Sequence, residues 1–151
     1  MKKNLKVSEI FNAYNVIGKA KYQKLEDSDK VKVWKISRQL KPIALQFEEE
    51  KEDATKSFYT EELIEKVRKG QQYEDAKKEG ASELPMTEQE YKEAIKEIVK
   101  AKALVEKALS ESLAKEVELE FEPISEEALG LLMASNDWNM AQVDMIEFIV
   151  Q

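Results

Sequence analysis

The sequence contains no cysteine and no histidine. Without them the chain has no disulfide framework, no thiolate nucleophile, no Cys/His zinc site and no Ser-His-Asp relay, so carboxylates are the remaining candidates for chemistry. Long apolar runs are missing too. No stretch approaches the roughly 20 apolar residues that span a bilayer, and the basic first residues lack the apolar run of a signal peptide. We therefore expect a soluble intracellular protein that does not associate with membranes.

Glycine and proline are scarce, with 4 and 3 residues among 151, whereas charged residues make up 36% of the chain. This composition favours long helices with solvent-exposed faces and predicts a mainly α fold. A hydrophobic content of 42% is enough for the core of one domain, so residues 1–151 are predicted to form a single domain. The formal net charge of −7 argues against nucleic-acid binding, which depends on lysines and arginines that displace counterions from phosphates.

Residues 116–123 read Glu-Val-Glu-Leu-Glu-Phe-Glu-Pro, a strict alternation that is typical of a strand with one buried and one exposed face. The other short alternating run lies at the start of the chain, where Leu5 and Val7 share a face. Lysines at positions 2, 3 and 6 would face glutamates at 118 and 120 across such a pair, which favours the pairing. We predict a two-stranded ribbon of about 3–7 with 117–122; the alternative is that one or both segments are extended linkers.

Between these two segments, the apolar residues recur at the spacing of helices. Ser8 is the predicted cap of a first helix, and a second helix carries an apolar stripe that passes Pro42 without losing phase, which predicts one kinked helix rather than two. Thr87 and Glu90 form a capping box for a third helix. We predict a long antiparallel helical hairpin with the first helix packed on it, and a flexible tip at 70–86. The predicted seam of the third helix is Tyr91, Ile95, Ile98, Lys102, Val105, Leu109 and Ser112.

Two short helices are predicted at the C-terminal end, the first capped by Ser125 and the second by Asp137, with Trp138 at its start. Two interpretations of this apolar tail remain open. It packs as core, with Trp138 as an anchor, or it is a docking surface whose candidate contact residues are Trp138, Met140, Met145 and Phe148. A DNA-binding helix-turn-helix is disfavoured, because the second helix has no lysine or arginine to contact phosphates.

The opening Lys-Val-Ser-Glu, the charged helical middle, the segment Glu-Val-Glu-Leu-Glu-Phe-Glu-Pro-Ile-Ser and the short helical tail together resemble small uncharacterised proteins of tailed bacteriophages and prophages. The likeness covers the two ends better than the middle. It implies a role in virion assembly or host takeover, in the cytoplasm of a bacterial host or on the virion. It brings no catalytic residues with it.

The leading functional hypothesis is a non-enzymatic protein–protein interaction protein, an accessory, structural or assembly factor of a phage, whose partners are phage structural proteins or a second copy of itself. The alternative is a small acidic inhibitor that blocks a basic surface of a host nucleic-acid-binding or defence enzyme. A third possibility is an enzyme in which Glu118 and Glu120 bind Mg²⁺ or act as acid and base. We expect no catalytic residue, no metal site and no cofactor.

Overall fold

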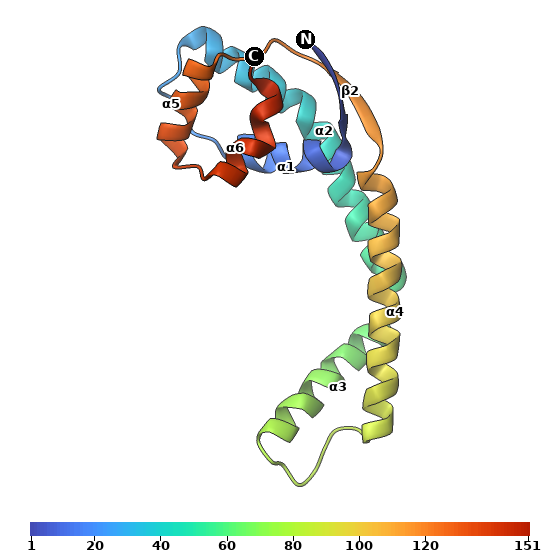
Figure 1. Cartoon of the computed structure of the whole chain (residues 1–151). Helices are drawn as coiled ribbons and strands as arrows, with labels where there is room; N and C mark the ends of the chain where they lie inside the picture. Colours follow the sequence, from blue (N-terminus) through green and yellow to red (C-terminus); the bar gives the residue numbers. More distant parts are fainter. The chain divides into compact units, whose positions relative to one another are not determined.

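The computed structural model describes all residues from 1 to 151 and is built mainly from helices (Figure 1). In chain order the elements are β1 (Lys2–Lys6), α1 (Val7–Ile17), α2 (Asp27–Phe58), α3 (Glu61–Lys78), α4 (Glu88–Leu113), β2 (Glu116–Glu120), α5 (Glu126–Asn136), α6 (Met140–Ile146) and the 3-10 helix η1 (Glu147–Ile149). The predicted class, mainly α with a two-stranded ribbon and a long helix packed against its neighbours, is confirmed. None of the helices is both long and apolar enough to cross a bilayer.

The chain divides into two compact units. The first consists of residues 1–49 together with 112–151, and the second consists of residues 50–111. In the first unit α2 packs against α1, where the rings of Phe11 and Phe47 meet edge to face with centroids 4.8 Å apart. The second unit contains residues 50–58 of α2, the whole of α3 and α4 up to residue 111. The expectation that all residues fold as one domain stays a prediction.

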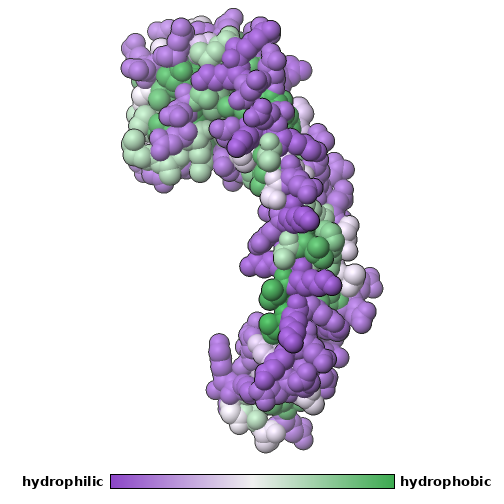
Figure 2. Space-filling view, turned by 45° about the vertical axis from the view of Figure 1, so that its right-hand side comes forward, coloured by the Kyte–Doolittle hydropathy of each residue, from purple (hydrophilic) through white to green (hydrophobic).

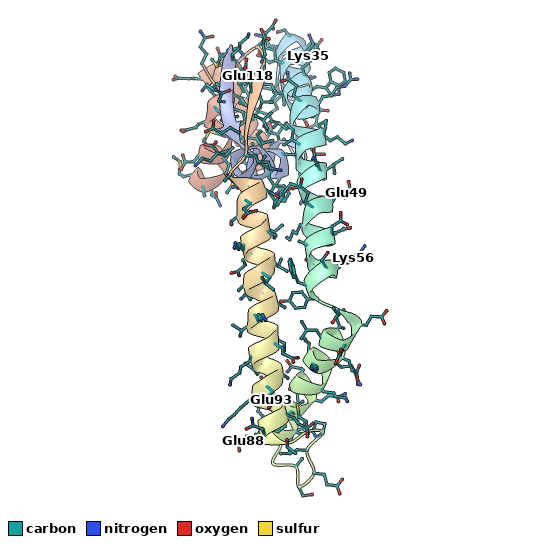
Figure 3. All side chains as sticks on the ribbon, turned by 90° about the vertical axis from the view of Figure 1, so that its right-hand side faces the viewer. Lys35, Glu49, Lys56, Glu88, Glu93 and Glu118 are labelled. Carbon is teal, nitrogen blue, oxygen red and sulfur yellow. The ribbon has the colours of Figure 1, made fainter.

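The ribbon joins two segments that lie far apart in the sequence. β1 pairs antiparallel with β2, so that Lys3 lies opposite Leu119 and Leu5 opposite Val117. Leu5 and Leu119 face the core, whereas Glu118 faces outward, where its carboxylate lies 3.8 Å from the Lys2 ammonium (Figure 3). Both side chains are exposed, so this pair contributes at most about 1 kcal/mol. The pairing predicted from alternation and charge is confirmed.

The first strand ends at Lys6, one residue before the predicted bound of 7, although the Val7 N–H still donates to the carbonyl oxygen of Lys115 at 2.9 Å. Val7 already belongs to α1, and the Lys6 N–H donates a hydrogen bond of 2.8 Å to Glu9 Oε2. The predicted helix cap at Ser8 is therefore wrong, because the carboxylate of Glu9 satisfies the backbone at the helix start instead. Beyond β2, the Phe121 N–H still donates to the carbonyl oxygen of Met1 at 3.0 Å, so the backbone pairing continues to Phe121.

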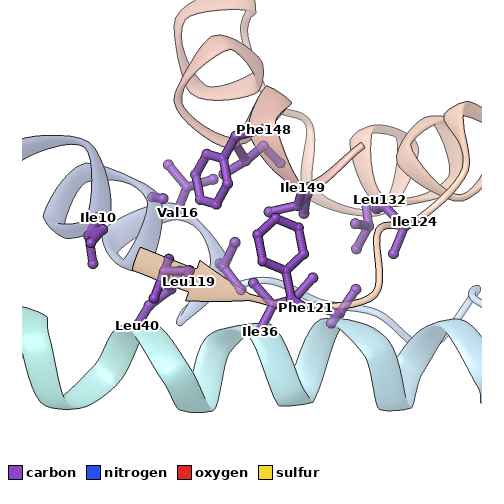
Figure 4. Packing of buried hydrophobic residues seen from close by; sticks show 14 of the residues in the cluster. Ile10, Val16, Ile36, Leu40, Leu119, Phe121, Ile124, Leu132, Phe148 and Ile149 are labelled. Atoms are coloured by element: carbon purple, nitrogen blue, oxygen red, sulfur yellow. The ribbon is translucent and has the colours of Figure 1, made fainter. Parts of the chain in front are cut away.

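The core of the first unit forms where α1, α2, the ribbon and the C-terminal segment meet (Figure 4). Ile124 is fully buried there, and its N–H donates to the carbonyl oxygen of Ile149 at 2.9 Å while its own carbonyl accepts from Gln151 at 3.0 Å. These bonds hold the end of the chain beside the segment that follows β2. The largest fully buried side chains are Ile10, Ile36, Leu40, Ile124, Leu132, Ile146 and Ile149.

Helix α2 runs through Pro42 without interruption, as its apolar stripe predicts. Pro42 is exposed, so its ring and its missing N–H lie on the solvent side of the helix. The opposite side of the helix is buried, and its buried residues recur at helical spacing: Val33, Ile36, Leu40, Ala44 and Phe47. The prediction of one helix rather than two is thus confirmed, whereas the predicted kink at Pro42 stays a prediction.

The second unit is held together by contacts between α3 and α4. Tyr73 stacks on Tyr91 with ring centroids 4.5 Å apart, and Lys66 Nζ lies 2.6 Å from a carboxylate oxygen of Glu97. Gly70 lies beside the Tyr91 ring, which a Cβ at that position would meet at 3.8 Å. The segment from Gly70 through Lys78, predicted as part of the tip, is therefore helical. Within the predicted tip 70–86, only residues 79–86 are irregular, and the mobility of this stretch stays a prediction.

The buried side of α4 differs from the predicted seam. Ala94 and Ala101, predicted to flank the seam, are buried, whereas the predicted seam residues Ile95 and Lys102 are exposed. Small side chains allow neighbouring helices to approach closely, so the alanines form the contact and the seam is rotated toward them.

The C-terminal helices begin and end at residues that differ in part from those predicted. Ser125 caps α5, accepting from the Ala128 N–H at 3.1 Å, as predicted. Asp137, predicted to cap α6, instead ends α5 in the left-handed conformation with φ 52°. Asn139 caps α6 by accepting from the Gln142 N–H at 2.9 Å. Trp138 accordingly lies between the two helices and does not begin the second.

Candidate functional site

The four residues predicted as a docking surface have different environments. Met140 is 69% exposed and Met145 is 39% exposed, whereas Phe148 is only 8% exposed. Trp138 is half-buried and packs against the core of the first unit. The structure brings two of the four together, because Met145 and Phe148 line the same groove.

This groove lies between α1 and the segment of α6 and η1, all within the first unit, and has a volume of about 270 Å³. We call it the α1–α6 groove. Its other lining residues could not be recognised as a site from the sequence, because α1 and α6 lie at opposite ends of the chain and only their packing brings them together. The lining residues are Leu5, Glu9, Asn12, Asp144, Met145, Glu147 and Phe148.

One wall of the groove follows from the amphipathic pattern of α1. Ile10 and Ala13 are fully buried on the core side of this helix. Glu9 and Asn12, three residues apart, share an exposed face of the helix and line the groove. Glu9 is also fixed at its carboxylate, which accepts the hydrogen bond from the Lys6 N–H.

The opposite wall follows from the alternation of inward and outward residues along α6. Val143 and Ile146 are buried, and Asp144 and Met145 between them are exposed. The 3-10 turn then buries Phe148, whose ring lies edge-on to Phe121 with centroids 6.0 Å apart (Figure 4). Phe148 is therefore a core residue that forms part of the groove floor, and it does not project from the surface.

The charges of the groove are unbalanced. Glu9, Asp144 and Glu147 line it, and none of the three forms an ion pair with a lysine or arginine. Lys3, which shares the core-facing side of β1 with Leu5, is half-buried and also forms no ion pair. The carboxylates do not belong to any group of three or more residues placed to hold a metal ion. The groove thus combines an apolar floor with carboxylates that lack a cationic partner.

A second concavity of the first unit, about 320 Å³, lies between α2 and the end of β2. Here Gln39 donates a hydrogen bond of 2.6 Å to the carbonyl oxygen of Glu120. Lys32 and Lys35 line the same space as Glu120 and Glu122, so its charges are matched. Glu118 and Glu120, the pair considered for catalysis, are not brought together in this concavity, because Glu118 does not line it.

The concavity of the second unit, about 300 Å³, is built around Tyr73 and Tyr91. The Tyr91 hydroxyl donates a hydrogen bond to Glu74, which raises the pKa of Tyr91 above its usual value. The Lys77 ammonium lies 5.2 Å from the centre of the Tyr73 ring. Its charged groups are thus engaged with one another inside the unit.

Exposed apolar side chains also occur on the second unit, and Figure 2 shows them as green atoms among the charged ones. They come from both α3 and α4. The most exposed of them are Ile64 at 56% and Val99 at 60%. Charged residues near these positions pair within the unit, Glu65 with Arg68 and Glu97 with Lys66, so the α1–α6 groove is the better-defined site.

Comparisons of the chain with protein-family models, with curated proteins and with solved structures give no match. The geometry and charge of the groove are therefore the features that bear on function.

Proposed function

We propose that this chain is a non-enzymatic protein–protein interaction protein that contacts its partner through the α1–α6 groove. The observation that carries the proposal is the combination of an accessible methionine, Met145, with an apolar floor and carboxylates that have no cationic partner. Methionine side chains adapt their shape to a partner, and apolar floors with polar rims are the usual anatomy of contact sites.

The groove is small, with a volume of about 270 Å³. A space of this size accommodates one or two side chains of a docked segment. The proposed function involves no cofactor.

The resemblance to small phage proteins suggests the biological setting of this proposal. The chain would act as an accessory, structural or assembly factor of a tailed phage, in the cytoplasm of a bacterial host or on the virion. The alternative is an acidic inhibitor that covers a basic surface of a host nucleic-acid-binding or defence enzyme. The net charge of −7 and the three groove carboxylates favour this alternative specifically.

Site-specific crosslinking tests the proposal. A photoreactive amino acid replaces Met145 in the full chain, and a matched variant carries it at Trp34, which is 51% exposed on α2 of the same unit. In a lysate of phage-infected bacteria we expect a discrete adduct from position 145 and none from position 34. Mass spectrometry of the adduct then separates the two settings: a phage structural protein supports the first, and a host nucleic-acid-binding or defence enzyme supports the second.

The control variant at position 34 also defines the results that would contradict the proposed function. If neither position gives an adduct, or if both give the same adducts in equal yield, the groove is not the contact site and the proposed function is wrong.

A further inference from the structure

We infer that the α1–α6 groove accepts a short basic segment of the partner protein, in which an arginine or lysine lies next to an apolar side chain. This inference rests on the proposed function and adds the chemistry of the ligand. It is carried by the juxtaposition of Glu9, Asp144 and Glu147 around a floor made by Leu5 and Phe148.

Six of the 31 acidic residues form ion pairs within the chain, as Glu97 does with Lys66 at 2.6 Å and Glu88 with Lys92 at 3.5 Å, so most carboxylates are unpaired. The groove differs from the other two concavities because no lysine or arginine lines it. In the groove, Asp144 and Glu147 have no such partner, and Glu9 accepts only a backbone N–H. Three negative charges around one small concavity create a field that attracts a cation, and complementary charge selects partners and speeds their association.

The arrangement of the groove carboxylates decides which cation fits. The carboxylates are not grouped as a metal site, so an organic cation on a side chain is the better match. Arginine and lysine carry a charged head on an apolar stem, which can lie along Met145 and Phe148 while the head reaches the carboxylates at the rim. Arginine adds planar geometry that matches carboxylates with two parallel hydrogen bonds.

The apolar floor of the groove places a second requirement on the docked segment. Leu5 and Phe148 are 7% and 8% exposed, so each presents a small part of its surface to the groove. A neighbouring apolar side chain of the docked segment covers this surface together with Met145. A single charged group would leave the floor in contact with water, whereas a basic residue next to a leucine satisfies both parts of the site.

Methionine-methyl NMR on the intact chain tests this inference. The chain has five methionines, so the methyl signal of Met145 reports the groove while that of Met86, in the second unit, is an internal control. The probe is a synthetic peptide with two arginines flanking a leucine, and the matched control peptide has citrulline in place of both arginines. We expect a saturable shift of the Met145 signal with the arginine peptide, little change with citrulline, and no shift of Met86.

Charge variants of the protein provide the second arm. The double variant Asp144→Asn/Glu147→Gln should bind the arginine peptide roughly 2- to 30-fold more weakly, the sum of two exposed ion pairs. The matched control, Glu52→Gln/Asp53→Asn, makes the same change of net charge at exposed residues of α2 in the second unit and should bind like the parent. Circular dichroism confirms that each variant keeps the parental helix content.

Three results would overturn the inference. In the first, the citrulline peptide would bind as tightly as the arginine peptide. In the second, both charge variants would lose the same affinity for the arginine peptide. In the third, the Met145 signal would move with protein concentration alone, which would place a second copy of the chain in the groove. If crosslinking from position 145 succeeds while any of these occurs, the partner chemistry is wrong and the docking site stands. If crosslinking fails as well, the proposed function falls with it.

Discussion

Replacing Trp138 with alanine tests whether this residue is a structural anchor or a contact residue. Trp138 lies between α5 and α6, is half-buried, and packs against the core of the first unit. A fully buried aromatic residue costs about 3–5 kcal/mol when it is cut to alanine. Since part of the indole remains in solvent, we expect Trp138→Ala to lower the free energy of unfolding by about 1.5–2.5 kcal/mol.

The chain provides a matched control in its other tryptophan. Trp34 belongs to the same unit but is 51% exposed, and the guanidinium of Arg38 lies 5.1 Å from the centre of its ring. A cation–π contact at an exposed site contributes about 0.5–1 kcal/mol, so Trp34→Ala should cost no more than about 1 kcal/mol. The two variants remove the same side chain and differ in burial.

Urea denaturation followed by circular dichroism and by the fluorescence of the remaining tryptophan measures both costs. Each variant keeps one tryptophan, and both positions report on the first unit. If Trp138→Ala unfolds like the parent, or costs no more than Trp34→Ala, Trp138 does not anchor the core. The docking interpretation of this residue would then be preferred, and its variant should weaken partner binding.

Two further predictions concern the ribbon and the loop between α3 and α4. Deleting residues 1–6 removes β1 and the buried Leu5, and it leaves the backbone of β2 without its partner. The melting temperature measured by calorimetry should therefore fall clearly. An unchanged melting temperature would mean that the ribbon does not stabilise the unit. Limited trypsin digestion should cut first after Lys77 or Lys78, which are exposed beside the irregular residues 79–87, while a first cut within 91–113 would contradict the helical pairing of the second unit.

The ribbon was predictable from the sequence because two independent signals agree on it. Alternation specifies which side of each strand is buried, and the lysines of one segment complement the glutamates of the other. The chain has only two such segments, so there was a single possible pairing. The exact strand end was not predictable in the same way, because at this point the Lys6 N–H donates to Glu9 while the next N–H, of Val7, still donates to the carbonyl oxygen of Lys115.

The helical course of residues 70–78 could not be predicted from local patterning. Gly70 and a polar neighbourhood indicate a weak helix, but Tyr73 stacks on Tyr91, which lies beyond the loop, and this contact stabilises the end of α3. The same limit applies to the groove. The spacing of Glu9 and Asn12 predicts one exposed helix face and that of Asp144 and Glu147 another, yet only the packing of α1 against α6 makes them a single site.

Burial along α6 changes from residue to residue, which bears on the contrast between a core tail and a docking tail. Val143 and Ile146 are buried, and the two residues between them, Asp144 and Met145, are exposed and line the groove. Successive residues of a helix are rotated by about 100°, so one short helix can contribute to the core and present a contact surface at the same time. Burial of Val143 and Ile146 fixes the direction in which Met145 points. It follows that changes on the buried side should affect stability first, whereas Met145→Ala should leave folding intact and reveal whether the exposed side contacts a partner.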